Sequence, residues 1–185
     1  MLAGALRYSH AVPELMTPTL RLHRSWLAAR DEWGPGVLQD GGGLHDDDDV
    51  DSREGFAAWI ERLRQAADLS IPPGQGRVHA TYWWVAEDGE YLGAITLRHA
   101  LNAFLRQAGG NVGYGIRPSA RGRGLAAWAL RSILPAAREL GLSEILITCN
   151  DSNLASARTI ENCGGVLEDI RDTELGRTRR YWITL

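Results

Sequence analysis

The chain has 185 residues, of which 44% are hydrophobic and 23% charged, a composition that excludes a disordered chain. Its length fits one domain with a full hydrophobic core. The net charge of −3 and the pI of about 5.9 exclude a general attraction to nucleic acid or membrane surfaces, and no run approaches the ~20 apolar residues of a membrane span. Cys149 and Cys163 make no disulfide framework, so we expect a reduced, cytoplasmic setting.

The N-terminal part predicts a tail, a short strand and a helix. Residues 1–8 lack a full signal-peptide pattern and are expected to form a frayed tail. Residues 10–16 predict a short strand at a sheet edge or a bulge, because Pro13 has no N–H to donate. Apolar residues recur at helical spacing over 19–33, and Gly34-Pro35-Gly36 ends that helix.

Residues 34–51 are loop-like and end in an acidic run. Asp46 to Asp49 and Asp51 repel one another, so the run is solvated or paired with a cation. Two interpretations stay open: an exposed linker that ends by capping the next helix, or an acidic lip that attracts a cationic amine. A metal site is disfavoured, because consecutive aspartates lack the alternate spacing of a calcium loop.

A second helix and three strands follow. Ser52 suits the N-cap of a helix over 53–69 with an apolar face. β-Branched and aromatic residues then predict three strands, at 81–86, 91–97 and 111–116. The turn Asp88-Gly89 joins the first two, and an irregular stretch precedes the third.

The turn from Arg117 to Ala126 joins the third strand to a helix and holds three arginines and two glycines. Such a turn exposes backbone N–H groups at a helix N-terminus, where the helix dipole also favours an anion. Glycine lets the backbone approach a phosphate closely, since no Cβ intervenes. The turn therefore predicts a pyrophosphate cradle.

The remaining elements complete a βαβ unit and a terminal hairpin. The helix should run from 125 to 140 with Gly141 as C′, and Pro135 should kink or weaken it. The apolar strand 144–149 should lie parallel to 111–116 through a right-handed crossover. A short helix and two terminal strands are expected at 154–162, 166–170 and 179–184.

The glycine turn and the segment after it resemble the GNAT superfamily of acetyl-CoA-dependent N-acetyltransferases. The family motif Arg/Gln-x-x-Gly-x-Gly/Ala is matched by Arg121-Gly122-Arg123-Gly124-Leu125-Ala126, and later motif positions by Asn153, Ser156 and Gly164. The resemblance covers about residues 80–185. The chain is also similar to a group of uncharacterised predicted acetyltransferases, which share Leu97-Arg98-His99, Asn102, Gly109-Gly110 and Arg180-Tyr181-Trp182.

The resemblance implies an α+β (α/β) fold. Its sheet would be mixed, mostly antiparallel and twisted, with about six or seven strands, a central parallel βαβ splay and helices on both faces. One domain would span 1–185. Within it, the helices over 19–69 would form the acceptor side, 80–165 the cofactor core and 166–185 a C-terminal hairpin.

The same resemblance implies transfer of an acetyl group from acetyl-CoA (coenzyme A) to a primary amine by direct attack in a ternary complex. The acceptor would be a small molecule or a peptide, with no nucleic acid, membrane or metal involved, and a homodimer is an open option. The alternative is a non-catalytic acyl-CoA-binding module of the same fold. DNA binding through the arginine turn is disfavoured, because the acidic chain has no other basic stripe.

The cofactor residues that the resemblance implies fall into three groups. The end of the third strand would face the pantetheine arm, and the turn from Arg121 to Ala126 would hold the pyrophosphate. Asn153 and Ser156, at the start of the short helix over 154–162, would contact the pantetheine or the adenosine side. In order they are Ile116, Arg117, Arg121, Gly122, Arg123, Gly124, Leu125, Ala126, Asn153 and Ser156. A backbone N–H near Ile116 could also bind the developing oxyanion.

Catalytic residues are harder to assign, because the family's usual tyrosine acid position holds Ile160 here. Tyr114, Tyr82 and Tyr181 are substitutes, and water is another. His99 is the main candidate base, since an unperturbed histidine pKa suits proton removal at neutral pH. The alternative is that His99 is satisfied by the loop after it. Weaker candidate bases are His79 and Glu87.

Two further groups have a functional and a structural interpretation. Cys149 is a nucleophile for a two-step route or a small buried hydrophobe at a strand end. The tryptophans on strands are core residues or the wall of an acceptor pocket with cation–π contact to an ammonium. They are Trp83, Trp84 and Trp182.

Overall fold

A computed structural model describes residues 12–34, 36–37 and 39–185, and every structural statement below concerns these residues. Their seven strands form one sheet in the order β1-β2-β3-β4-β5-β7-β6. Neighbours are antiparallel except β4 and β5, which confirms the predicted mixed, mostly antiparallel sheet. The strands are β1 Glu14–Met16, β2 Ala80–Glu87, β3 Glu90–Arg98, β4 Val112–Ile116, β5 Glu144–Asn150, β6 Val166–Thr173 and β7 Gly176–Thr184.

The parallel pair splays apart almost as soon as it forms. β4 and β5 are bridged at one position, Val112 opposite Ile147, whereas β3 pairs with β4 along the whole of β4. The N–H of Arg117 donates to the Leu92 carbonyl of β3 at 2.8 Å. Because N–H directions alternate along a strand, the N–H of Ile116 points away from β3, toward the gap.

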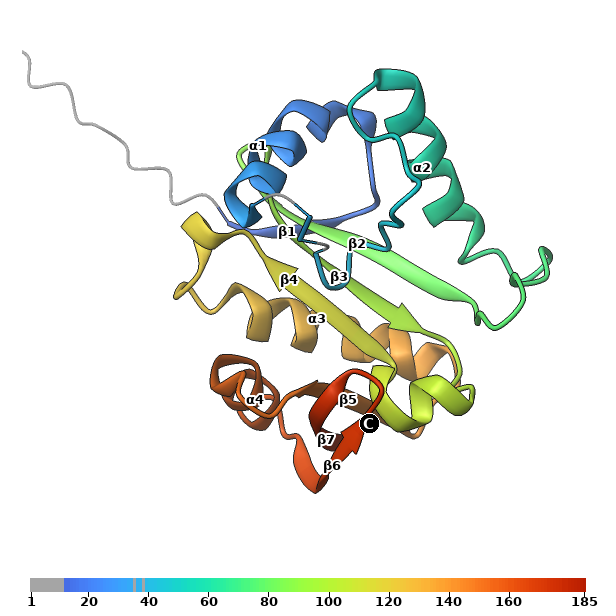
Figure 1. Cartoon of the computed structure of the whole chain (residues 1–185), viewed down its shortest axis with the longest axis vertical. Helices are drawn as coiled ribbons and strands as arrows, with labels where there is room; N and C mark the ends of the chain where they lie inside the picture. The colour runs from blue at the N-terminus through green and yellow to red at the C-terminus, as the bar shows by residue number, and fades with distance from the viewer. Residues whose placement is uncertain (1–11, 35, 38) are drawn as a thin grey trace, which may run out of the picture.

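Helices cover both faces of the sheet, as Figure 1 shows. A 3₁₀ turn, Leu20–Leu22, leads into α1 (His23–Trp33), which lies with α2 (Arg53–Gln65) on one face. The other face carries α3 (Leu125–Glu139) and α4 (Leu154–Glu161). Each face has its own buried cluster. The α1–α2 cluster is aromatic and consists mainly of Trp26, Phe56, Trp59, Trp84 and Tyr91.

Several element boundaries differ from the sequence prediction. α2 ends at Gln65, earlier than expected, and α3 continues through Pro135. Pro135 is exposed, so water can solvate the carbonyl group that lost its N–H partner. β6 and β7 extend toward each other to a tip at 174–175, because backbone pairing continues beyond the apolar residues. The predicted tail at 1–8 and the first two residues of the predicted strand 10–16 lie outside the described residues.

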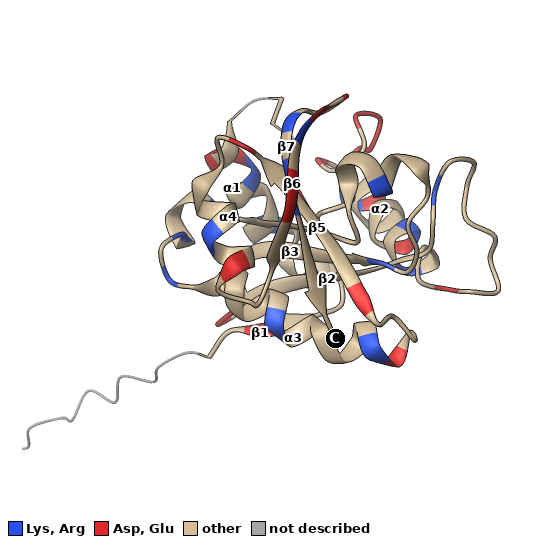
Figure 2. Cartoon of the chain, turned by 90° about the horizontal axis from the view of Figure 1, so that it is seen from below, with Lys and Arg blue, Asp and Glu red and all other residues tan. Residues whose placement is uncertain are grey.

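Arginine and acidic residues are interspersed along helices, strands and loops (Figure 2). All 20 basic residues counted in the net charge are arginine. Among the described residues, no helix is long and apolar enough to cross a membrane.

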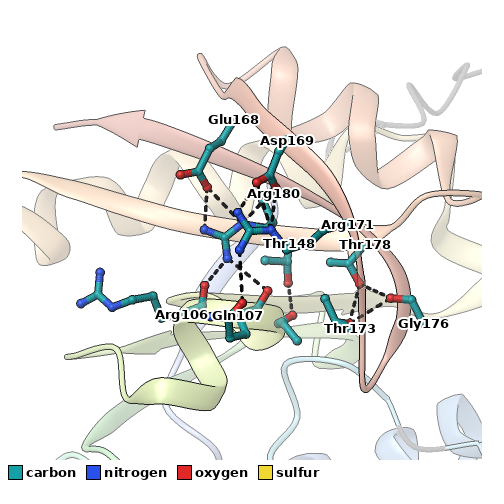
Figure 3. Close-up of polar contacts among 11 residues, drawn as sticks. Arg106, Gln107, Thr148, Glu168, Asp169, Arg171, Thr173, Gly176, Thr178 and Arg180 are labelled. Carbon is teal, nitrogen blue, oxygen red and sulfur yellow. Dashed lines mark hydrogen bonds and ion pairs between the residues drawn. The ribbon is translucent and has the colours of Figure 1, made fainter.

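The irregular stretch before β4 ends in a π-helical turn, η2 (Leu105–Gly109), whose carbonyl groups receive arginine donors. Arg180 of β7, whose side chain is 4% exposed, donates to the carbonyl oxygens of Arg106 and Gln107 and to the Glu168 carboxylate (Figure 3). Thr148 of β5 donates to the next carbonyl, that of Ala108, at 2.5 Å. These bonds fasten η2 to the far side of the splay.

We expect Arg180→Ala to lower the free energy of unfolding by about 2–3 kcal/mol, because two carbonyl oxygens and a carboxylate lose charge-assisted bonds in a buried place. The matched control is Arg171→Ala. Arg171 is 39% exposed and binds the Asp169 carboxylate, so its loss should cost less than about 1 kcal/mol. Urea denaturation of both variants measures the difference, and equal losses would contradict the role assigned to Arg180.

Candidate functional site

A cleft of about 750 Å³ occupies the splay between β4 and β5. β4 contributes Tyr114, Gly115 and Ile116, and β5 contributes Thr148 and Cys149. The glycine turn and the start of α4 close its ends. The cleft therefore exists because two neighbouring parallel strands stop pairing, which leaves backbone groups of β4 facing an open space.

The glycine turn leaves the N-terminus of α3 open to this cleft. Gly122 (φ +77°) and Gly124 (φ +75°) adopt the left-handed conformation that side chains disfavour. Neither has an atom within 4 Å of where a Cβ would lie. Gly124 is the N-cap and makes no side-chain capping bond, so the first N–H groups of this 15-residue helix have no intrahelical acceptor. This arrangement suits a phosphate group.

The three arginines of the turn have different roles. Arg121 lines the cleft, donates to the Ile116 carbonyl at 3.0 Å and lies 4.6 Å over the Trp33 ring. Arg117 lies elsewhere, because its Nε donates to Glu32 at 3.0 Å and its Nη1 to the Tyr91 carbonyl at 3.0 Å. The N–H of Arg117 is also taken, as described above. Arg117 therefore does not line the cleft, contrary to the sequence expectation.

Arg123 is likewise not among the residues that line the cleft. Its guanidinium binds both carboxylate oxygens of Glu87, at 2.7 and 2.8 Å. Glu87 is thereby paired with a cation, which makes it a poor candidate for a base. The pair joins the glycine turn to the end of β2. The other implied cofactor residues do line the cleft: Ile116, Arg121, Gly122, Gly124, Leu125, Ala126, Asn153 and Ser156.

Tyr114 and Ser156 meet across the cleft. The tyrosine hydroxyl is 2.7 Å from the serine Oγ, and the Asn153 side chain accepts from the Ser156 N–H at 3.1 Å as the N-cap of α4. Burial raises the pKa of Tyr114 well above its usual range, so the hydroxyl keeps its proton. Burial also raises the pKa of the Cys149 thiol, which disfavours the thiolate that a two-step route would need.

The other two predicted catalytic residues lie outside the cleft. His99 is half-buried with its Nε2 2.8 Å from the Thr81 hydroxyl, and it lines neither the cleft nor the second cavity described below. Burial, followed by the effect of His79, lowers its pKa. Tyr181 is fully buried and donates to Glu161 at 3.0 Å, so its hydroxyl has no access to the cleft. Ile160 is also fully buried.

The tryptophans of the strands are structural. Trp84 is fully buried in the aromatic cluster, and Trp83 packs against the other core. Neither these two nor Trp182 lines the cleft or the second cavity described below. Their interpretation as an acceptor wall is therefore not supported, and Trp33 is the tryptophan that lines the cleft.

Asp40 lines the cleft from a loop that crosses β4, and sequence reasoning missed it. The residue is exposed, but the protein around its carboxylate desolvates the group in part and raises its pKa, opposed by the charge of Arg98. The loop fits closely: a Cβ on Gly115 would lie 2.8 Å from the Asp40 carbonyl oxygen. The paired glycines of β4, Gly113 and Gly115, were the available sign that something packs there.

The loop that carries Asp40 is anchored at alternate residues. Gln39 accepts from the Tyr91 hydroxyl at 3.0 Å, and the Gly41 carbonyl accepts from Thr96. The Gly43 carbonyl accepts from the Trp59 indole at 3.3 Å. These bonds hold the Asp40 backbone against the strand that borders the splay.

The acidic run after this loop is mostly paired or used as a cap. Asp48 binds Arg62, Asp51 lies 2.7 Å from Arg30, and Asp49 accepts from the Ser52 hydroxyl beside the N-terminus of α2. None of these aspartates lines the cleft or the second cavity described below, which supports the linker interpretation.

One acidic group could hold a metal ion by geometry alone. Ligand atoms of His45, Asp47 and Asp48 lie within 4.8 Å of one another. However, the Nε2 of His45 is 3.2 Å from Arg62 and 2.6 Å from Arg77, and these two cations oppose a third at that place.

A second cavity of about 510 Å³ lies on the α2 side and shares Arg98 and Phe104 with the cleft. His79 and Tyr82 line it, and its wall between α2 and β2 is formed by residues 71–74. The two cavities thus meet where β3 ends and β4 begins.

Comparison with known proteins identifies relatives by family and by fold. The chain matches the family model described as "Acetyltransferase (GNAT) domain" over residues 45–166. A search of curated protein sequences found no match.

Solved structures with the same fold include several acetyltransferases. The ribosomal L7/L12 α-N-protein acetyltransferase RimL in complex with coenzyme A is 15% identical, with 94% of each chain covered and a TM-score of 0.69. The microcin C7 self-immunity acetyltransferase MccE in complex with acetyl-CoA and AMP is 14% identical over 94% of this chain and 92% of that one, with a TM-score of 0.68. A Salmonella typhimurium enzyme that modifies the N-terminal serine of L7/L12 is 15% identical over 94% and 95%, with a TM-score of 0.65. At these identities the likeness establishes the fold alone.

Proposed function

Because the chain belongs to the family of GNAT acetyltransferase domains, we propose that it transfers the acetyl group of acetyl-CoA to a primary amine by direct attack in a ternary complex. The observation that carries this proposal is the uncapped N-terminus of α3, which opens through two left-handed glycines into the splay cleft. A helix start of this kind binds the pyrophosphate, and the splayed strand offers its backbone to the pantetheine arm.

The residues present fit the cofactor. The open turn at Gly122 and Gly124 has room for phosphate oxygens, and Arg121 adds a guanidinium at the cleft wall. Asn153 and Ser156 line the opposite end beside α4. The cleft volume of about 750 Å³ lies within the ordinary range for cofactor sites.

Acetyl-CoA supplies an activated acetyl group, whose carbonyl carbon is attacked by the amine and whose carbon–sulfur bond then breaks. Asp40 accepts the proton of the amine, since its raised pKa and its place in the cleft suit a general base. The Ile116 N–H would donate to the carbonyl oxygen of the bound acetyl group. Tyr114, which is hydrogen-bonded to Ser156, would donate a proton to the leaving sulfur in place of the acid missing at Ile160. Asp40 would then release the proton of the amine to solvent, and solvent would reprotonate Tyr114.

The runner-up is a non-catalytic acyl-CoA-binding module, which Ile160 favours because the family's usual acid is absent. Asp40 and Tyr114 favour the enzyme, because a binding module needs no titratable groups beside the splay. Among the structural relatives, RimL acetylates a ribosomal protein α-amine. A peptide amine and a small-molecule amine are therefore both candidate acceptors for this chain.

The reaction is tested by measuring release of free coenzyme A from acetyl-CoA with a panel of amines. The chain contains no lysine, so self-acetylation of lysine side chains adds no background. We expect amine-dependent release with at least one member of the panel. Measurable coenzyme A binding with no release from any amine would replace the enzyme by the binding module.

Replacement of Gly124 by valine should abolish cofactor binding, with at least a tenfold rise in the Kd of coenzyme A, because the side chain would stand where the phosphate must approach. Gly141→Val is the matched control. Gly141 also has a positive φ (+79°) with open space around it, but lies at the other end of α3. Both variants should lose about 1–2 kcal/mol of stability. Calorimetry that finds equal affinity in both would reject the cradle.

Replacement of Asp40 by asparagine should lower kcat about a hundredfold, the usual contribution of a general base. Asp40 acts as a base only when it is deprotonated, and its pKa is raised. The kcat of the wild-type protein should therefore fall as the pH drops through the pKa of Asp40, which lies above that of an ordinary aspartate. The kcat of the variant should lack this fall at low pH, which a pH–rate profile measures.

Two controls separate Asp40 from its competitors. Asp47→Asn makes the same change on an exposed residue that lines neither cavity, and should leave kcat unchanged. His99→Gln tests the base predicted from the sequence. If His99→Gln removes the fall of kcat at low pH and Asp40→Asn does not, the base is His99.

A further inference from the structure

The second cavity is strongly basic in a chain that is acidic as a whole. Three arginines and two histidines line it, and no carboxylate does so among the described residues. They are His45, Arg62, Arg77, His79 and Arg98. With a net charge of −3, this concentration of positive charge at one cavity does not follow from composition.

Two of these arginines have no carboxylate partner within 4 Å in the described part of the chain. Arg98 donates to the carbonyl oxygens of Gly109 and Gly110, at 2.9 and 3.1 Å, and is mostly buried. Arg77 has the neutral nitrogen of His45 as its neighbour, at 2.6 Å. Arg62, in contrast, is neutralised by Asp48. The mostly buried guanidinium of Arg98 attracts an anion more strongly than one in bulk water, because the local dielectric is lower.

The pKa of His45 is a second sign of the positive potential in this cavity. Burial lowers its pKa, and the charges of Arg62 and Arg77 lower it further, so it stays neutral at pH 7. Its ring therefore adds a hydrogen-bonding group and no charge. The cavity presents the guanidinium groups of Arg77 and Arg98, neither with a carboxylate within 4 Å among the described residues, and Arg98 lies at the junction with the cleft, where its charge acts on Asp40.

The junction fixes how a ligand in this cavity faces the reaction site. The Nη2 of Arg98 is 3.6 Å from the place where a Cβ on Gly113 would lie, so the guanidinium touches β4 one residue before Tyr114. Asp40 lines the cleft on the same side of the strand, beside Gly115. An anionic group on Arg98 would leave a nearby amine directed toward the splay and the candidate base.

Resting on the proposed function, we propose that the second cavity binds the acceptor and that the acceptor is a small amine carrying a carboxylate or a phosphate group. Arg98 and Arg77 bind the anion. The apolar wall of Ile71, Pro72, Pro73 and Phe104 covers the rest of the molecule. The volume of about 510 Å³ holds a small organic molecule.

An acceptor with an anionic group differs from the cationic amine that an acidic lip at residues 46–51 would attract. A polyamine keeps a second ammonium group after the first reacts, and that group needs a carboxylate nearby. The cavity offers guanidinium groups instead, and its neighbouring aspartate, Asp48, is occupied by Arg62.

The test uses amines matched in every respect except the anion. Common amino acids are compared with their carboxamides, and phosphoethanolamine with ethanolamine, with spermidine as the cationic case. The first pair reports a carboxylate and the second a phosphate. An amide has the lower amine pKa and so the larger neutral fraction, which means that a preference for the free acid runs against intrinsic reactivity. We expect kcat/KM to be at least about tenfold higher for one anionic member than for its neutral partner.

Arg77→Gln should raise KM for the preferred anionic amine about tenfold, with little change for its neutral partner or for acetyl-CoA. Arg53→Gln is the control, because Arg53 is an exposed arginine on α2 outside the cavity. Binding of the same amines to the coenzyme A-loaded protein is measured in parallel by calorimetry.

The outcomes separate this inference from the proposed function. Transfer that favours neutral amines or spermidine, or that is equal within each pair, keeps the acetyltransferase and overturns the anionic acceptor. Absence of transfer with every amine counts against the acetyltransferase, and calorimetry then decides the inference: binding of an anionic amine that Arg77→Gln weakens supports it, and no such binding overturns it.

Discussion

The single bridge between β4 and β5 is the constraint on which the rest of the structure depends. It opens the cleft, but it also leaves a strand edge whose polar groups need partners in the interior. Asn111, which is 2% exposed, sets where the gap begins: it donates to the Arg98 carbonyl at 3.1 Å and accepts from the Leu146 N–H at 2.9 Å. At the other end the Arg121 guanidinium satisfies the Ile116 carbonyl. The splay is thus bounded by side chains at both ends.

The π-helical turn beside the splay is a consequence of the same constraint. A turn of this kind leaves several carbonyl oxygens without backbone donors, and Arg98, Thr148 and Arg180 supply donors from three different strands. Arg98 lies at the end of β3 and Arg180 in β7. Their common role is to hold η2 between the two cavities, so one hydrogen-bonded unit supports both the cofactor cleft and the proposed acceptor site.

Arginine serves two purposes in this protein, and its partners decide which. Arg117 and Arg123 are paired with Glu32 and Glu87 and fasten the glycine turn to α1 and β2. The hydrogen bond from Arg117 lowers the pKa of Glu32 to about 2, against the opposing effect of desolvation. Arg77, Arg98 and Arg121 line the cavities without a carboxylate partner among the described residues. The structural pairs thus leave positive charge at the places where anionic ligands would bind.

The sequence by itself determined the features that depend on neighbours along the chain. The strand–glycine turn–helix–strand order is local, so residue type and spacing predicted the parallel βαβ unit and the glycine turn, and the family resemblance supplied the mixed sheet class. The tertiary structure alone decided which side chains reach it. Glu32 captures Arg117 from 85 residues away, and Tyr91 holds the loop of Asp40 through Gln39 from 52 residues away. Such contacts depend on how distant segments pack, and no local pattern encodes them.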